Sequence, residues 1–206
     1  MTTQGTLKVI GLTILVVVAP IVLTVNFGTG VASAEPVQID SCTSIDAPGR
    51  YLLNESIAEV STDPTCFRIT ANDVVLDGQG HTVDGGREGI AVEATAVSNV
   101  TIKNITIIDF PIGIVFQTVD DGKILRNTVD SSELENKGII LDDSEKITIE
   151  ANHVDEATTA IELNGSATSN NVENNLLRFG GVGLTIAGVA SHNTVENNHL
   201  ETVSSG

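Results

Sequence analysis

Residues 113–141 read GIVFQTVDDGKILRNTVDSSELENKGIIL, so the unit Gly113-Ile114-Val115-Phe116 returns as Gly138-Ile139-Ile140-Leu141. Apolar residues alternate with variable ones inside each unit, which is the pattern of a strand with one buried face. Similar units recur along the chain at steps of 23, 24, 25, 22 and 23 residues, and their leading apolar residues are Phe67, Ile90, Ile114, Ile139, Ile161 and Leu184. A period of this length predicts a solenoid.

Two further apolar columns advance in step with the first. The second column is Leu76, Ile102, Ile124, Ile149, Val172 and Val195, and the third is Val83, Ile107, Val129, Val154, Leu177 and Leu200. Three apolar columns that advance together argue against a disordered asparagine-rich segment. The residues between the columns show no helical periodicity, which argues against a leucine-rich repeat. We therefore expect an all-β, parallel β-helix of about six coils, right-handed by the rule for parallel crossovers.

A ladder of mostly polar residues lies two positions before the third column: His81, Ile105, Asn127, Asn152, Asn175 and Asn198. Asparagine tolerates the left-handed backbone of a sharp bend, and its amide can bond to the amide of the next coil. We expect this ladder to be structural and to sharpen the register of the coils.

The N-terminus resembles an export segment. Lys8 precedes an apolar run over residues 9–25, and Ala32-Ser33-Ala34 fits an A-x-A cleavage pattern. We expect residues 1–34 to be a signal peptide, with an uncleaved membrane anchor through residues 9–25 as the alternative. Residues 35–65 then form an N-terminal cap, residues 66–206 form the β-helix, and the protein is extracellular or on the cell surface.

The chain is strongly acidic, with 27 acidic against 10 basic residues and a net charge of −17. This charge excludes nucleic acid and anionic lipid as favoured partners, and it is typical of halophilic proteins. Cys42 and Cys66 are the only cysteines, and in an exported chain they predict one disulfide that fastens residues 37–65 to the first coil. Glycosylation sequons begin at Asn54, Asn99, Asn104 and Asn164.

The stretches CFRITANDVVLDGQGHTVDG at 66–85 and NVTIKNITI at 99–107 resemble exported NosD-like β-helix proteins. The opening SCTSIDAPGRYLLNESI at 41–57 is similar to the cap of halophilic archaeal members. This resemblance implies a repeat shared by carbohydrate-binding proteins and sugar hydrolases, and one relative is an accessory factor for the copper site of nitrous oxide reductase. Copper handling needs Cys, Met or clustered His ligands, whereas His153 and His199 lie two coils apart, or about 9.6 Å.

The outward positions of the first strand are expected to read Arg68, Ala91, Val115, Ile140, Glu162 and Thr185, with no convergent catalytic groups. Acidic residues gather elsewhere on two adjacent coils: Asp120, Asp121, Asp142, Asp143 and Glu145. They could hold Ca²⁺, although their different offsets and the neighbouring Lys123 and Lys146 favour ordinary solvated carboxylates. We predict no catalytic residue, no resident metal and no cofactor other than this candidate Ca²⁺.

A shallow apolar surface at Val115 and Ile140 completes the candidate binding residues. The function expected from these features is a non-catalytic binding or structural role, with a polysaccharide or an envelope protein as partner. A polysaccharide lyase or hydrolase and the copper accessory factor are the alternatives. The final coil shows no amphipathic capping helix, from which we expect either a partner at that end or a chain shortened from a longer β-helix.

Overall fold

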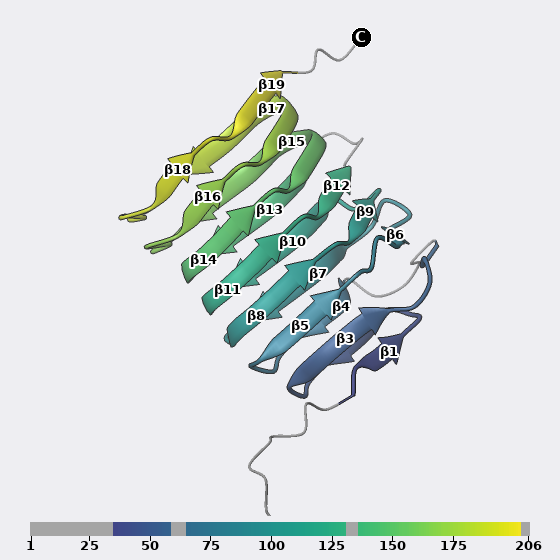
Figure 1. The fold of residues 1–206 in the computed structure, drawn as a ribbon. Helices are drawn as coiled ribbons and strands as arrows, with labels where there is room; N and C mark the ends of the chain where they lie inside the picture. Colours follow the sequence, from purple (N-terminus) through teal and green to yellow (C-terminus); the bar gives the residue numbers. More distant parts are fainter. Residues whose placement is uncertain (1–34, 59–64, 131–135, 203–206) are drawn as a thin grey trace, which may run out of the picture. The chain divides into compact units, whose positions relative to one another are not determined.

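Stacked parallel strands make up the part of the chain that the computed structural model describes, residues 35–58, 65–130 and 136–202 (Figure 1). All strand pairs of the described ranges are parallel, which confirms the predicted parallel solenoid of about six coils. No helix in this part of the chain is long and apolar enough to cross a membrane. The expected signal peptide or anchor, residues 1–34, lies outside the described residues.

The strands stand in three columns. The first column contains β2 (Thr43–Ile45), β4 (Thr65–Ile69), β7 (Ile90–Thr95), β10 (Ile112–Gln117) and β13 (Lys137–Asp142). The second contains β1 (Val37–Ile39), β3 (Gly49–Leu53), β5 (Val74–Asp77), β8 (Ser98–Lys103), β11 (Asp120–Leu125), β14 (Glu145–Glu150), β16 (Asn171–Glu173) and β18 (Thr194–Glu196). The third contains β6 (Thr82–Asp84), β9 (Thr106–Ile108), β12 (Thr128–Asp130) and β19 (His199–Thr202).

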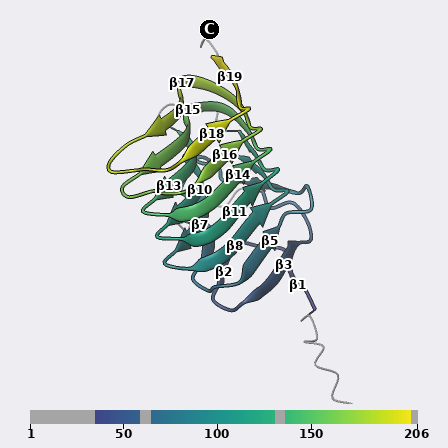
Figure 2. The same ribbon diagram turned by 60° about the vertical axis from the view of Figure 1, so that its left-hand side comes forward.

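Two long strands join the third column to the first. β15 (His153–Asn164) and β17 (Leu176–Ile186) start in the third column and continue through the first, so these two columns form one 11-stranded sheet. The second column forms a separate 8-stranded sheet, and the turned view in Figure 2 shows the coils stacked in sequence order.

The register confirms the second and third apolar columns residue by residue. It corrects one position in the first column, because Phe67 and Ile114 both align with Val92 rather than with Ile90. In β7, Ala91 and Val92 are both buried while Ile90 and Glu93 are half-buried on the outer side. Gly89 precedes Ile90 in the same way that a small residue precedes the leading apolar residue of the other units. The predicted frame therefore assigned Ile90 to the position that Val92 occupies, two residues later.

Small residues line the inner corner between the third and first columns. Ala91, Gly113, Gly138, Ala160 and Gly183 occupy successive coils there. A Cβ added to Gly138 would lie 2.5 Å from the carbonyl oxygen of Ala160 and 2.5 Å from a methyl group of Val154. The corner therefore has room only for a small residue on each coil, because the backbone of the next coil passes directly over it.

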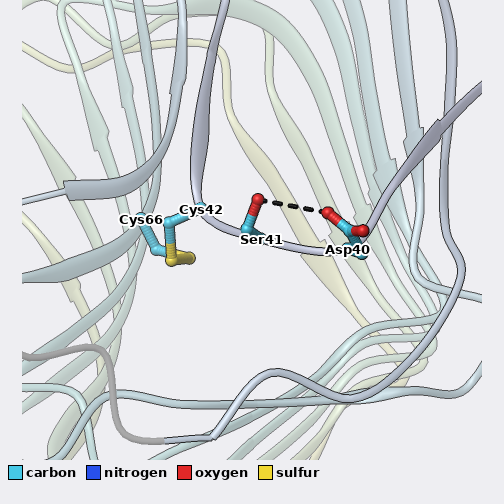
Figure 3. Close-up of a disulfide and its surroundings, with 4 residues drawn as sticks. All are labelled: Asp40, Ser41, Cys42 and Cys66. Atoms are coloured by element: carbon cyan, nitrogen blue, oxygen red, sulfur yellow. Dashed lines mark hydrogen bonds between the residues drawn. A yellow bond between two sulfur atoms is a disulfide. The ribbon is translucent and has the colours of Figure 1, made fainter.

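The disulfide lies in this same corner column. Cys42 and Cys66 are bonded, with their Cα atoms 4.5 Å apart, as the sequence predicts (Figure 3). Cys42 precedes β2 and Cys66 lies in β4, and pairing of Thr43 with Phe67 places the two cysteines opposite each other. The bond thus ties two adjacent coils, and β1, β2 and β3 extend both sheets toward the N-terminus.

The asparagine ladder is a continuous chain of hydrogen bonds. The Nδ2 atoms of Asn127, Asn152 and Asn175 donate to the Oδ1 atom of the next asparagine at 3.1, 3.1 and 2.9 Å. Each Oδ1 atom also accepts the backbone N–H of the preceding ladder residue, beginning with Ile105. The left-handed backbone lies one residue earlier than expected, at Asn104, Arg126, Ala151, Asn174 and Asn197.

A second ladder, which the sequence analysis did not identify, stabilises the bend before the second column. The Oδ1 atom of Asn170 accepts the N–H of Ile147 at 2.8 Å, and the Oδ1 atom of Asn193 accepts the N–H of Asn170 at 3.0 Å. Their Nδ2 atoms donate to the carbonyl oxygens of Ser144 and Ala167. Each of these bends is therefore closed by an amide from the following coil.

The buried carboxylate of Asp77 organises the DGQGHT turn. Its oxygens accept hydrogen bonds from Asn104 and Arg50, and Lys103 Nζ lies 3.2 Å away. Burial raises the pKa of Asp77, but hydrogen bonds from Asn104, from the backbone N–H of Gln79 and from the two cations outweigh it and lower the pKa to about 2. His81 of this turn aligns with Ile105 of the ladder.

Candidate functional site

The acidic residues singled out in the sequence lie around the bend between the first and second columns. Asp120 and Glu145 are opposite each other in β11 and β14, and Lys146 Nζ contacts both, at 3.0 and 3.2 Å. Asp121 aligns with Lys146, and its backbone has a left-handed conformation. The structure therefore pairs two of these acids through a lysine.

The other two acids of this group are separated from that pair. The Oδ1 atom of Asp143 accepts both the N–H and the hydroxyl of Ser166 at 2.8 Å, and these bonds lower the pKa of Asp143. Asp142 ends β13 opposite Gln117 and Asn164. Within the described ranges, no three His, Cys, Asp or Glu residues are arranged to hold a metal ion.

The outer face of the first column carries an apolar centre between two ion pairs. Val115 and Ile140 are in register, as predicted, and are half-buried. Arg68 contacts Glu93 at 2.6 Å on one side, and Lys137 contacts Glu162 at 2.6 Å on the other. The outward residue of β7 is therefore Glu93 and not Ala91, which is buried, so the face is more charged than the sequence analysis expected.

The outer face of the third column carries what we call the polar row: Asp130, Asp155, Arg178 and Glu201. These residues are in register on four successive coils. Arg178 Nη1 lies 2.6 Å from Asp155 Oδ2, and its Nε lies 3.4 Å from Glu201. One guanidinium thus joins two carboxylates along the stacking direction.

Histidines flank the polar row. His153 Nε2 lies 3.7 Å from Asp155 Oδ2, and His199 Nε2 lies 2.8 Å from Glu201 Oε1. Leu176 separates the two histidines on the intervening coil, so they stay two coils apart as expected. The histidines therefore act with the carboxylates of their own strands and do not form a pair.

The electrostatics of the polar row are uneven. Burial raises the pKa of Asp130, and the negative charges of Asp155, Glu156 and Asp109 raise it further. The arginine next to Asp155 compensates the charge of that carboxylate instead. The row thus places a carboxyl group with a raised pKa beside a carboxylate that is paired with a cation.

Two polar atoms in this region are buried without a hydrogen bond to any described residue. They are Asp155 Oδ1 and His153 Nε2, although the side chains themselves are 18% and 38% exposed. Buried polar atoms are nearly always paired in native proteins. A carboxylate oxygen of Asp155 and a ring nitrogen of His153 therefore lie beneath the charged surface without a hydrogen bond among the described residues.

The four sequons differ in their surroundings. Asn54 and Asn99 are exposed, and Asn99 donates to Asp73 Oδ1 at 2.7 Å. Asn104 is bonded to Asp77, and Asn164 is bonded to Glu162. The amide that a glycan would modify is thus already used in three of the four, and glycosylation stays a prediction.

Comparison with known proteins supports the fold. The family model described as the right handed beta helix region matches residues 60–200, and no curated protein matches the chain. A solved structure of a mutant DFA-IIIase from Arthrobacter chlorophenolicus A6 in complex with DFA-III is similar, with a TM-score of 0.55, 16% identity and 81% of this chain covered. The same enzyme without its lid gives a TM-score of 0.53, 16% identity and 80% coverage. The chain spans 41% and 43% of the length of these structures.

Proposed function

Because the chain belongs to the family of right-handed β-helix proteins, we propose that it binds a carbohydrate outside the cytoplasm without cleaving it. The polar row and its flanking histidines are the binding surface. The observation that carries this proposal is the register of the polar row on four successive coils, where the partly exposed guanidinium of Arg178 joins Asp155 and Glu201.

The chemistry of the row matches that of sugar hydroxyl groups. A hydroxyl donates one hydrogen bond and accepts others, so one hydroxyl can donate to the half-exposed carboxylate of Glu201 while a neighbouring one accepts from Arg178. Successive coils repeat such groups about every 4.8 Å. A repeating ligand that lies along the stack can therefore meet several of these side chains at once.

Two further features support an exported, carbohydrate-binding protein. The Cys42–Cys66 disulfide is typical of oxidising compartments. The structurally similar DFA-IIIase was solved with DFA-III bound, which makes DFA-III a first ligand to test. The acidic composition and the resemblance to NosD-like halophilic proteins support tests in concentrated salt.

The test compares ligand retention by the wild type and two arginine variants. A glycan array, with DFA-III measured separately by calorimetry, identifies the ligand in high salt. We expect Arg178→Ala to weaken binding at least tenfold, whereas Arg126→Ala, which removes an exposed arginine from a different bend, leaves it unchanged. Equal binding by both variants, or no retention of any glycan by the wild type, would refute the proposal.

Export has its own test. The mature protein recovered from the culture medium should begin at Glu35, and N-terminal sequencing measures this directly. A protein that keeps residues 1–34 and sediments with membranes would instead support the anchor through residues 9–25.

Carbohydrate cleavage is the second candidate function, and the Asp130–Asp155 pair favours it. Glycoside hydrolysis uses one protonated and one ionised carboxyl group, and the raised pKa of Asp130 beside an arginine-bound Asp155 provides that asymmetry. Release of reducing ends by the wild type, abolished in Asp130→Asn, would support cleavage. Absence of release from every bound glycan, or release that survives Asp130→Asn, would exclude this pair.

A further inference from the structure

The outer face of the 8-stranded sheet separates basic from acidic side chains. Alternation along each strand places two outward residues on this face per coil. Its basic half comprises outward residues of β3, β8 and β11: Arg50, Lys103 and Lys123. Its acidic half comprises outward residues of β14, β16 and β18: Glu150, Glu173 and Glu196. The charge of this face therefore changes sign between β11 and β14, which are neighbours in the sheet.

The acidic half has no cation of its own. Glu150, Glu173 and Glu196 are in register on successive coils, about 4.8 Å apart. None of the three forms an ion pair with another described residue. Like charges that lie opposite each other on neighbouring strands destabilise a sheet. A set of cations placed over this half would therefore relieve a repulsion that the single chain leaves in place.

The basic half keeps an excess of positive charge. Its only carboxylate on the sheet is Asp77, which is 7% exposed and already contacts Arg50 at 3.1 Å and Lys103 at 3.2 Å. Lys123 is exposed, and it forms no ion pair with a described residue. This half therefore fits a carboxylate-rich surface, and the acidic half of the same face is such a surface.

Between the charges, the outward side chains are short or apolar. They include, in register from β5 to β18, Val75, Thr101, Thr148, Asn171 and Thr194. Figure 2 shows the strands of this sheet following one another along the stack. Sheets pack face to face at a distance of about 10 Å, and short side chains between the charges permit that approach.

We propose that this face is the interface of a two-fold dimer of the chain. A turn of 180° about an axis along the strands, between β11 and β14, places β14 of one copy over β11 of the other, and β16 over β8. Residues at the same height along the strands then meet, so Glu173 faces Lys103. Lys123 faces Thr148, and Glu150 is two residues further along that strand, about 7 Å away and within reach of a lysine. Symmetry makes each contact twice.

The charge pattern selects this arrangement over the other face-to-face dimer. A two-fold axis along the stack would place each strand over its own copy, so that Lys123 meets Lys123 and the glutamates meet glutamates. Like charges across an interface cost several kcal/mol, whereas the axis along the strands brings opposite charges together. The interface also lies in a different sheet from the polar row, so the dimer does not depend on carbohydrate binding and leaves both rows uncovered.

The net charge of −17 sets the conditions in which the dimer forms. Repulsion between the two copies arises from charges spread over their whole surfaces, and it acts over a screening length of about 30 Å at 0.01 M salt and about 3 Å at 1 M. Ion pairs in contact and partly buried are screened much less. We therefore expect the dimer to become more stable as salt is raised to about 1 M.

The test measures the dimer dissociation constant of the purified protein by sedimentation equilibrium at about 1 M NaCl. Lys123→Glu and Glu150→Lys should each raise this constant at least tenfold, because each variant brings like charges together at the interface. The two substitutions in one chain should restore it, because Glu at position 123 of one copy then faces Lys at position 150 of the other.

The matched control changes the net charge equally on another face. Lys137→Glu lies on β13 of the 11-stranded sheet and should leave the dissociation constant unchanged. Circular dichroism verifies that each variant keeps its fold. A wild type that stays monomeric at every salt concentration, a dimer that tolerates Lys123→Glu, or a double variant that is not restored would overturn the proposal. An equal loss in Lys137→Glu would show that net charge alone controls association and would overturn it as well.

Discussion

Removal of one amide from the middle of the asparagine ladder should destabilise the whole stack. Asn152 is 2% exposed, and its Nδ2 atom donates to the carbonyl oxygen of Ile124 at 2.8 Å and to Asn175 at 3.1 Å. Its Oδ1 atom accepts the N–H and the amide of Asn127 at 2.9 and 3.1 Å. Asn152→Ala thus breaks four hydrogen bonds that no water can replace without entering the core.

The magnitude follows from the groups that are left unpaired. The carbonyl of Ile124 and the N–H of Asn127 lose their partners at a buried bend, and each such group costs about 1 to 3 kcal/mol. The Nδ2 atom of Asn127 keeps its bond to Ile102, so its contribution is smaller. We expect Asn152→Ala to lower the free energy of unfolding by about 3 to 5 kcal/mol.

The matched control lies at the open end of the same ladder. Asn198 is half-buried and makes three side-chain hydrogen bonds, but water can reach the groups that Asn198→Ala exposes, so the expected loss is about 1 kcal/mol. Urea unfolding followed by far-ultraviolet circular dichroism measures both variants. If the two losses agree within about 1 kcal/mol, the ladder does not act as a buried network and the reasoning is wrong.

Three further predictions address other parts of the coil. Gly138→Ala should lower the unfolding free energy by about 1 to 3 kcal/mol through overpacking, whereas Gly180→Ala, whose added Cβ would meet nothing within 4 Å, should be near neutral; equal midpoints in urea would contradict the tight corner. Replacement of Cys42 and Cys66 by alanine should cost about 3 to 4 kcal/mol by the chain-entropy model, seen as a lower unfolding midpoint, and no change would show that the loop adds no constraint. Because the folded pKa of Asp77 is about 2, its contribution of about 2 kcal/mol is present above pH 4 and lost as the pH falls toward 2; Asp77→Asn should flatten the stability profile in that window, and an unaltered profile would refute the assignment.

Periodicity was sufficient to predict the columns but not every frame within them. The second and third columns were predicted residue by residue because their members advance from coil to coil in nearly the same steps and keep a nearly constant offset from one another. In the first column, Ile90 and Val92 are both apolar and two residues apart, so sequence alternation fits either frame. The pairing of Val92 with Phe67 and Ile114 decides between the two frames. The sequence of this strand alone does not contain that information.

The polar row was missed although its signal was present. Each of its members follows a third-column residue directly: Val129, Val154, Leu177 and Leu200 precede Asp130, Asp155, Arg178 and Glu201. The outward positions were read only for the first column, where the shifted frame also hid Glu93. What the sequence could not provide is the burial of Asp155 Oδ1 and His153 Nε2, because it depends on how neighbouring coils cover those atoms.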